Sequence, residues 1–354
     1  MREIVEKLTK KIKKSFLLYT LGMFLSVERR SCVQIARFWK ISHDFLYRFL
    51  SKADLFLPVF PTLTMSLIKH FSEQKKGWLI IDDTIVSKLY SSFLAGIWQI
   101  FNPTTKSRDR GLCLVVLAWS NGNVTIPIAF EWMFARELVQ EYYKTKSQIA
   151  KELLMNYHKI VPYLYFLADA HYSTRDGLIP FLRKKKIPFV MKITRTRKIH
   201  TKKVESQVKN HPALKLYRNQ RDAKLRAKYG KYWFYLSVHK RKDKRGEYTY
   251  TYLISSMNLD AKEYLEVYDG RWKIEVMFRT LKQHFGLAHC SVRDLDKQKA
   301  HIYAIFCGFG FVQNEMAKKN FENSEDTIKY LRKLKSSIVC NRIEALYGNF
   351  DHVA

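Results

Sequence analysis

Cysteine is scarce in this sequence of 354 residues, and its pattern excludes two kinds of structure. The five cysteines are scattered along the chain, and no two of them form a C-x-x-C pair. An odd, unpatterned set argues against a disulfide framework and against a zinc site. We therefore expect a protein of the reduced cytoplasmic compartment.

Hydrophobic runs of membrane-spanning length are also missing. The apolar stretch Phe16–Val27 follows the basic segment Lys10–Lys14 and so superficially resembles a signal peptide. The stretch is too short to span a bilayer, and it continues into Glu28-Arg29-Arg30 instead of a small-residue cleavage site. We expect it to form a buried helix, in a protein with no membrane partner.

Acidic residues are in short supply, because 32 Asp and Glu stand against 63 Lys and Arg and give a formal net charge of +31. With 47% hydrophobic and 14% aromatic residues, the chain is too apolar to be disordered. Its length allows about two or three domains. The positive excess indicates an anionic partner, with nucleic acid the first candidate and an anionic membrane surface the second.

About two-thirds of the net charge lies in one segment, Arg183–Arg245, which holds 23 Lys and Arg against three acidic residues. Within it, Tyr232–His239 and the following Glu247–Ser255 alternate with a period of two around a basic turn, which predicts a β-hairpin. A run of charge is usually only a solvated face. The density of this one favours contact with phosphates.

Residues 1–75 are predicted to be helical. Ser42 is a credible N-cap for a helix whose apolar face carries Phe45, Leu46, Phe49 and Leu50. With the short helix before it, this segment is similar to a helix-turn-helix, although the usual turn glycine is missing. The two interpretations are a DNA-binding region and an ordinary helical hairpin.

From Gly77 the pattern changes to strands. Trp78–Ile81 predicts a buried strand that ends at Asp82-Asp83-Thr84. Two apolar runs, Leu112–Trp119 and Val124–Trp132, flank an Asn-Gly pair and predict a hairpin.

The next elements complete an α/β pattern. Glu137–Tyr157 predicts one long amphipathic helix, Tyr163–Ala168 a buried strand ending in Asp169, and Ile187–Ile193 a further strand after a short helix. The order is three antiparallel strands, a helix, a parallel strand with a carboxylate at its end, a helix and a strand. This is the order of the ribonuclease-H-like fold, which other α/β arrangements share in part.

The most informative stretch begins at Tyr268. If it is one helix, then Tyr268, Arg271, Glu275 and Lys282 project from a single arc about 60° wide. Apolar residues on the neighbouring arc would seat the helix on a core. Spacing alone would also fit a surface ion-pair ladder, since Arg271 and Glu275 are i,i+4 partners.

The same stretch, Tyr-x2-Arg-x3-Glu-x6-Lys with Trp272 after the Arg, resembles the signature of DDE transposases from one large bacterial insertion-sequence group. Asp82-Asp83-Thr84 is similar to the first aspartate motif of that family, D-x-T, and Asp169-Ala-His171-Tyr172 to the second. The D-x-T spacing favours Asp82 as the ligand, with Asp83 as the alternative. The resemblance spans about residues 75–290.

The resemblance implies a domain organisation. A ribonuclease-H-like catalytic core would comprise residues 76–194 and 256–290, interrupted by a basic β-rich insertion at 195–255. A helical, DNA-binding region at 1–75 and a C-terminal helical region at 291–354 would flank it, the latter by analogy with dimer contacts in related transposases.

The resemblance also implies catalysis and metal binding by Asp82, Asp169 and Glu275. Mg²⁺ prefers carboxylate oxygens, and two Mg²⁺ ions, or Mn²⁺ as a substitute, would clamp the attacking and leaving oxygens of a phosphodiester. Three residues near Glu275, namely Tyr268, Arg271 and Lys282, would hold DNA phosphates near the transposon end. For Trp272, a stacking role in DNA binding and core packing are equally open.

The predicted function is that of an insertion-sequence transposase, which cleaves DNA at terminal inverted repeats and transfers the strand to target DNA. Its partner would be double-stranded DNA, bound by a homodimer or larger assembly in the cytoplasm, associated with the nucleoid. The alternatives are a ribonuclease-H-like nuclease that does not join strands and a catalytically silent DNA-binding descendant. A membrane-surface protein is the remotest alternative.

Overall fold

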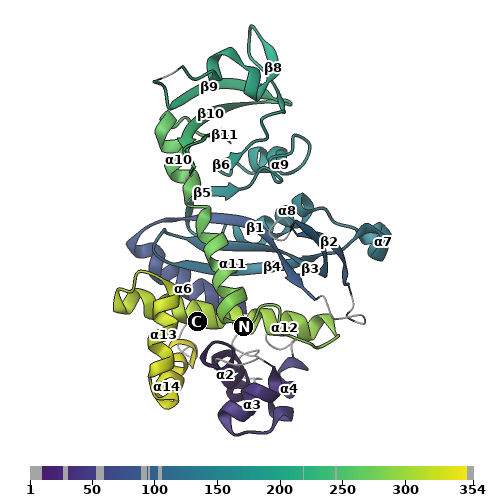
Figure 1. Ribbon diagram of the computed structural model, residues 1–354, viewed down its shortest axis with the longest axis vertical. Coiled ribbons are helices and arrows are strands. Elements are labelled where there is room, and N and C mark those ends of the chain that lie inside the picture. The colour runs from purple at the N-terminus through teal and green to yellow at the C-terminus, as the bar shows by residue number, and fades with distance from the viewer. Residues whose placement is uncertain are drawn as a thin grey trace.

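The computed structural model describes residues 10–26, 31–52, 60–88, 94, 96–102, 106–217, 219–243 and 245–348. It is a mixed α/β structure in which one long sheet runs from a lobe of strands at one end to a set of helices at the other (Figure 1). Parts of the predicted terminal regions, residues 1–9, 27–30, 53–59 and 349–354, lie outside the described residues. In the described part, no helix is long and apolar enough to cross a membrane.

Every described element before Gly77 is a helix. These elements are α2 (Lys10–Leu25), α3 (Cys32–Trp39), α4 (His43–Leu50) and α6 (Phe60–Gln74). The expected buried helix is α2, whose Leu21, Met23 and Phe24 are fully enclosed.

The turn between α3 and α4 follows the sequence prediction closely. Ser42 caps α4 by accepting a hydrogen bond from the backbone N–H of Asp44, and Leu46, Phe49 and Leu50 are buried. Lys40 ends α3 in the left-handed conformation, with φ of 53°, which is where a helix-turn-helix usually has glycine. The missing glycine therefore did not prevent the turn.

The central sheet begins with antiparallel strands and continues with parallel ones. Its strands are β1 (Gly77–Ser87), β2 (Trp98–Asn102), β3 (Ser107–Ser120), β4 (Thr125–Met133), β5 (Tyr163–Ala168) and β6 (Phe189–Lys192). β3 pairs antiparallel with β1, β2 and β4, whereas β5 runs parallel to β1 and β6 parallel to β5. The hairpin of β3 and β4 is confirmed, but the edge strand β2 was not predicted.

The long helix predicted over Glu137–Tyr157 is wrong. The chain forms a short helix α7 (Arg136–Val139), a 3₁₀ turn η1 (Gln140–Tyr142) and then α8 (Lys146–Tyr157). Gln140 has φ of 44°, which stops the first helix. Thr145 starts the second one as N-cap, in a capping box with Gln148. The periodicity correctly predicted helical structure in this range, but the Thr145 cap and the conformation of Gln140 divide it into two helices.

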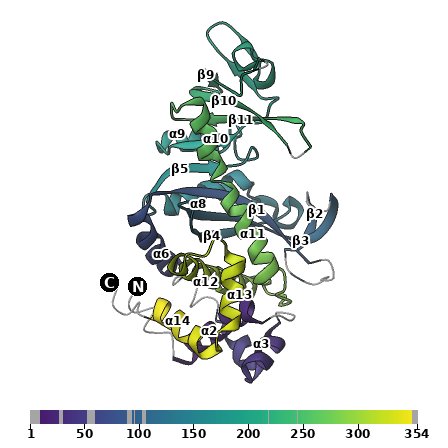
Figure 2. The same cartoon turned by 60° about the vertical axis from the view of Figure 1, so that its left-hand side comes forward.

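The basic segment is a lobe of strands that continues the central sheet. It contains β7 (Lys198–His200), β8 (Glu205–Gln207), η2 (Val208–Asn210), η3 (Pro212–Leu214), β9 (Asp222–Tyr229), β10 (Tyr232–Lys242) and β11 (Tyr248–Ser255). The short helix α9 (Leu178–Lys184) precedes β6 and contacts α8. The predicted hairpin is β10–β11. Because β11 also pairs with β6, core and lobe share one 11-stranded sheet (Figure 2).

After the lobe the chain returns as α10 (Ala261–Asp269) and α11 (Trp272–His284), which lead from the lobe down across the sheet (Figure 2). It continues as α12 (Leu295–Lys319), α13 (Ser324–Lys333) and α14 (Ser336–Gly348). The buried helix α12 contacts α2, α4, α6 and β4. A buried hydrogen bond of 2.8 Å between the Tyr19 hydroxyl and His301 Nδ1 joins the N-terminal helices to α12.

Candidate active site

The register of the sheet places Asp82 and Asp169 beside each other. The parallel pairing of β1 with β5 ends at Ile81 opposite Ala168, so each aspartate is the next residue of its chain. The expectation that the strand itself ends at Asp82 is wrong, because pairing with β3 extends β1 to Ser87. Only the parallel pairing stops there, which opens the sheet between the two carboxylates.

The neighbouring residues Asp82 and Asp83 have different surroundings, as expected for side chains that alternate along a strand. Asp82 Oδ2 accepts a hydrogen bond of 2.8 Å from Nη1 of Arg271. Asp83 instead accepts from Lys146 Nζ at 2.7 Å and from the Tyr172 hydroxyl at 3.3 Å. The first acid faces the junction of α10 and α11, and the second is bonded to α8 and to the loop after β5.

Arg271 connects the separate parts of the site. Besides Asp82, its guanidinium donates to Oε1 of Glu275, and it lies 5.6 Å from the centre of the Tyr268 ring. The Tyr268 hydroxyl donates a long hydrogen bond of 3.5 Å to Oδ1 of Asp169. A continuous series of contacts thus joins the three predicted acids through one arginine and one tyrosine.

The stretch from Tyr268 to Lys282 is not one helix, because Gly270 separates α10 from α11. α10 ends at Asp269 and α11 begins at Trp272, and between them Arg271 N–H donates to the Tyr268 carbonyl at 2.9 Å, in the tighter 3₁₀ pattern. A Cβ atom on Gly270 would lie 2.8 Å from the Trp78 ring of β1. Glycine therefore lets this junction approach the strand closely enough for Arg271 to reach Asp82.

Burial and the neighbouring negative charges raise the pKa of Asp82, the acid at the centre of the site. Burial of Asp82 raises its pKa to about 7; Arg271 opposes this increase, while Asp83 and Asp169 add to it. Burial also raises the pKa of Tyr268, so its hydroxyl stays protonated as a donor to Asp169. Nε of Arg271 is buried and has no hydrogen-bond acceptor among the described residues. A nearby positive charge would therefore stabilise the ionised form of Asp82, and Nε of Arg271 is available as a hydrogen-bond donor to a further ligand.

Lys282 and Trp272, two of the predicted DNA contacts, do not belong to the series of contacts that joins the three acids. Lys282 is exposed on α11, and within the described chain no hydrogen bond or ion pair joins it to the acids. Trp272 is 52% exposed with the Arg279 guanidinium 5.9 Å from its ring centre, so the core-packing interpretation is wrong.

Sequence reasoning missed two residues that support the site, Lys146 and Tyr172. Tyr172 stands within the second aspartate motif, three positions after Asp169, so the motif itself contained a signal. Lys146 lies at the start of α8 and had no recognisable pattern around it. Its contact with Asp83 depends on the break in the predicted long helix.

Three carboxylates are a suitable donor set for Mg²⁺. Yet among the residues that the structure describes, no group of three or more His, Cys, Asp and Glu side chains is arranged to hold a metal ion. In this conformation the Arg271 guanidinium bonds to both Asp82 and Glu275. The chemistry of the residues fits a divalent cation, and metal binding by Asp82, Asp169 and Glu275 stays a prediction.

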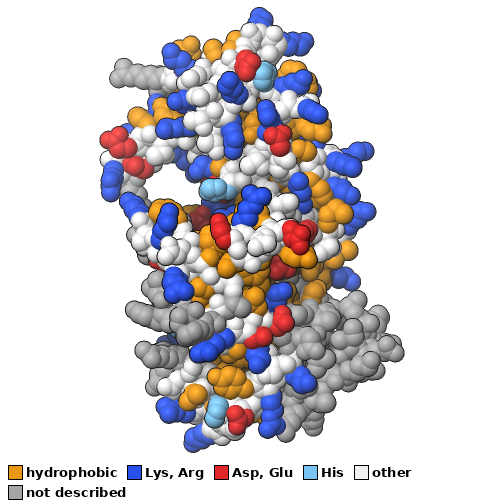
Figure 3. Space-filling model, turned by 90° about the vertical axis from the view of Figure 1, so that its right-hand side faces the viewer, with side chains coloured by type: hydrophobic (Ala, Val, Ile, Leu, Met, Phe, Trp, Pro, Cys, Tyr) orange, Lys and Arg blue, Asp and Glu red, His pale blue; other side chains and the backbone are white. Residues whose placement is uncertain are grey.

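The face of the molecule shown in Figure 3 carries Lys and Arg side chains on both the upper lobe and the core, around a hollow between them. A cavity of about 740 Å³ borders the loop after Asp169. Four of its lining residues are the cations Lys146, Arg175, Arg197 and Lys198. Asp176 lines it too and pairs with Arg175, and Lys146 pairs with Asp83, so Arg197 and Lys198 supply the positive charge beyond these two pairs.

Residues 139–308 match the family described as transposase DDE domain. The match supports a DDE transposase. It includes Asp169, Arg271 and Glu275 and begins after Asp82, so the link from Asp82 to the matched region is the hydrogen bond with Arg271. No curated protein matches the sequence.

Proposed function

We propose that this protein is an insertion-sequence transposase that cleaves DNA at terminal inverted repeats and transfers the freed strand into target DNA. One observation carries the proposal: Asp82 in β1, Asp169 directly after β5 and Glu275 in α11 are joined by contacts of Arg271 and Tyr268. The family match independently supports a DDE transposase over a general DNA-binding protein.

The proposal includes a ribonuclease-H-like core. The spatial strand order β4-β3-β1-β5-β6 supports it, with antiparallel strands on one side and parallel strands on the other. Two of the acids follow the end of the parallel pairing, and α11 brings the third to them. The β-rich lobe between β6 and α10 corresponds to the insertion that the family resemblance implies.

Asp82, Asp169 and Glu275 would hold two Mg²⁺ ions, or Mn²⁺ in their place. When bound, such ions supply an activated water and stabilise the leaving oxygen of a phosphodiester. Tyr268 holds Asp169 through its hydroxyl, and Arg271 neutralises Asp82 and Glu275 until DNA is present. A DNA phosphate is a strong competing acceptor for a guanidinium, so DNA entry would draw Arg271 away from the acids.

Double-stranded DNA is the proposed partner, both as transposon end and as target. The exposed Trp272 and Lys282 on α11, with the basic lobe, would contact it. A homodimer or larger assembly on paired ends, and association with the nucleoid, belong to the same proposal. Binding should weaken steeply with salt, because phosphate contacts release counterions.

The test is cleavage and joining of a labelled DNA that carries the element's own ends, in Mg²⁺ or Mn²⁺. Wild type is compared with Glu275→Ala and with the control Glu266→Ala, whose exposed carboxylate on α10 pairs with Lys262. We expect joined product from wild type and Glu266→Ala, and none from Glu275→Ala although it still binds DNA. Nicking without joining would indicate the nuclease, and metal-independent binding alone would indicate the silent descendant.

A further inference from the structure

A buried lysine lies at the far end of the strand that carries Asp82. Lys88 directly follows β1 and is 8% exposed. Its Nζ donates hydrogen bonds to two backbone carbonyls, that of Ala288 at 2.8 Å and that of Cys290. Among the described residues no carboxylate pairs with it. Lysine is almost never buried without such a pair, so the two carbonyls are what holds this charge inside the protein.

Both carbonyls belong to the turn that follows α11. Gly286 begins this turn with φ of 66°, in the left-handed region that favours glycine. The Leu287 N–H donates back to the Leu281 carbonyl at 3.1 Å, which is the pattern of a Schellman motif. Because these bonds join the turn to the last residues of the helix, a contact with the turn also holds the end of α11.

The segment around α11 is therefore joined to β1 at both ends. At the start of the strand, Gly270 lies so close to Trp78 that an added Cβ would be 2.8 Å from the ring. Further along, Arg271 bonds Asp82, and beyond the end of the strand Lys88 bonds the turn. Successive positions of the strand meet successive positions of the later segment, so α11 runs beside β1 in the same direction.

Other buried side chains hold the same turn from a different direction. Gln298 of α12 donates through Nε2 to the Cys290 carbonyl at 3.0 Å. Nε2 of His301, also in α12, lies 3.2 Å from the Gly286 carbonyl. These contacts attach the turn to α12 and involve no residue of β1. Lys88, in contrast, connects the turn to the strand that carries the candidate metal ligand.

We propose that Lys88 is a positioning residue, which holds α11 along β1 and so keeps Glu275 beside Asp82 in the geometry that metal binding requires. Glu275 lies between the two attachments of α11, and a helix fixed at both ends cannot slide along the strand without breaking one of them. An ammonium group suits this role, because it has several donors and can bond two carbonyls of one turn at once. The proposal rests on the proposed function, in which Glu275 is a metal ligand.

The experiment compares the full-length protein with Lys88→Met, which keeps an unbranched side chain but removes its donors. Mn²⁺ affinity is measured by calorimetry without DNA at pH 7, where Lys88 is still charged although burial lowers its pKa to about 8. We expect Lys88→Met to bind Mn²⁺ about 10- to 100-fold more weakly, the usual cost of removing a residue that orients a metal ligand. Lys88→Arg, which keeps donors for both carbonyls, should restore most of the affinity.

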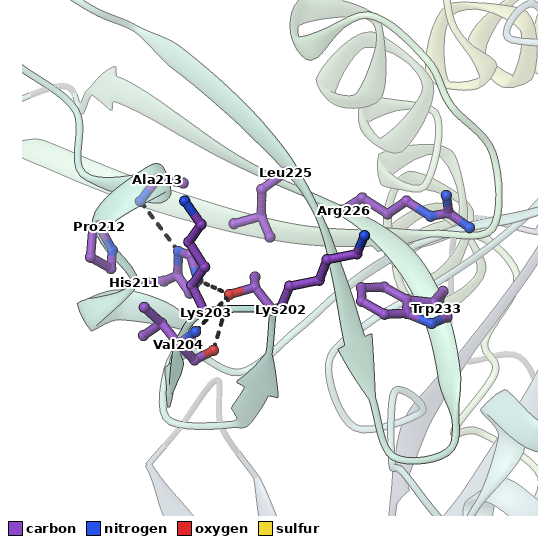
Figure 4. Close-up of a pocket in the computed structure, with 10 residues that line it drawn as sticks. Lys202, Lys203, Val204, His211, Pro212, Ala213, Leu225, Arg226 and Trp233 are labelled. Atoms are coloured by element: carbon purple, nitrogen blue, oxygen red, sulfur yellow. Dashed lines mark hydrogen bonds between the residues drawn. The ribbon is translucent and has the colours of Figure 1, made fainter.

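Two control variants separate positioning from general stability and from net charge. Gln298→Met loosens the same turn from α12, so it should lower the free energy of unfolding while the Mn²⁺ affinity stays close to that of wild type. Lys203→Met removes an exposed lysine from the wall of a cavity of about 690 Å³ in the strand lobe (Figure 4). It should change neither quantity, and it controls for the loss of one positive charge.

Hydrogen exchange of α11, followed by mass spectrometry without metal or DNA, tests the link independently of the proposed function. Amides of residues 276–290 should exchange faster in Lys88→Met than in wild type, and those of α8 at the same rate. Faster exchange together with a wild type that binds no Mn²⁺ would contradict the proposed function and still confirm that Lys88 holds α11.

Four results would overturn the positioning role. They are unchanged exchange of α11 in Lys88→Met, unchanged Mn²⁺ affinity in that variant, an equal loss of affinity in Gln298→Met, and a Lys88→Arg variant as defective as Lys88→Met. Unfolding of Lys88→Met, with a folded Lys88→Arg, would also overturn it, because Lys88 would then serve stability alone.

Discussion

Arg271 donates a hydrogen bond of 2.8 Å to Asp82 although 189 positions separate them in the sequence. The same guanidinium bonds Glu275, so one cation neutralises two of the three predicted metal ligands. A guanidinium also forms two parallel charge-assisted hydrogen bonds with the oxygens of a single phosphate, so a phosphate can compete with the two carboxylates. Arg271 would thus occupy the acids in the free protein and hold DNA in the complex.

Removal of this arginine should therefore have opposite effects on two ligands. In Arg271→Ala we expect Mn²⁺ to bind more tightly, by roughly tenfold or about 1.4 kcal/mol, because no guanidinium competes for the acids. DNA ends should bind more weakly in the same variant. Calorimetry with Mn²⁺ and anisotropy with DNA measure the two effects. Arg279→Ala, which removes an exposed arginine of α11, is the control for the metal affinity, and an unchanged metal affinity in Arg271→Ala would contradict the assignment.

Lys282 tests the proposed course of DNA along α11. If it contacts one phosphate, Lys282→Ala should reduce the slope of log Kd against log salt concentration by about 0.9. Lys318→Ala removes another exposed lysine, at the far end of α12, and should leave the slope as it is. Anisotropy titrations at several salt concentrations decide between these results. Equal slopes for all three proteins would exclude Lys282 from the interface.

Gly270 tests the junction between α10 and α11. A Cβ atom there would lie 2.8 Å from the Trp78 ring, so Gly270→Ala should lower the free energy of unfolding by about 1–3 kcal/mol through overpacking. It should also weaken strand cleavage, since Arg271 follows directly. The double variant with Trp78→Ala should recover part of the loss, which urea titration of all four proteins would show as a coupling energy. If the changes in the free energy of unfolding of the two single variants simply add up in the double variant, the contact between Gly270 and the Trp78 ring does not determine the effect.

The buried pair of Tyr19 and His301 predicts a pH dependence of stability. Burial lowers the pKa of His301 to about 3, below the unfolded value of 6.5. The stability that depends on neutral His301 is therefore complete above about pH 6.5 and is lost as the pH falls towards 3. Between pH 7 and pH 5 the loss should be about 2 kcal/mol in urea titrations, and His301→Gln should show less of it. If the free energy of unfolding fell equally with pH in wild type and His301→Gln, the pH dependence would not come from His301.

Much of the fold follows from short-range patterns. The apolar runs around Asn121-Gly122 formed the expected hairpin, where Asn121 Oδ1 accepts the N–H groups of Asn123 and Val124, both at 3.0 Å. The cap at Ser42 is also as predicted. In both cases a few adjacent residues determine the structure, so their sequence contains the needed information.

Features that depend on distant partners could not be predicted. β11 joins β6 through a pairing that no local pattern indicates, and this makes the lobe part of the central sheet. The close approach of Gly270 to the Trp78 ring joins two positions nearly two hundred residues apart. The different surroundings of Asp82 and Asp83 likewise depend on distant residues, since Arg271 contacts the first and Lys146 the second.

The most direct test of the proposed site compares Asp82 with Asp83. The two residues are adjacent and chemically identical, but only Asp82 is proposed to bind the catalytic metal ions. Strand transfer should be measured for Asp82→Asn and Asp83→Asn across a range of Mg²⁺ concentrations, with DNA binding and thermal unfolding as controls for folding. We expect Asp82→Asn to form no joined product at any Mg²⁺ concentration. Asp83→Asn should retain it, reduced by no more than about 100-fold as for residues that support a metal ligand. Loss of joining in Asp83→Asn with activity kept in Asp82→Asn would contradict the proposed site.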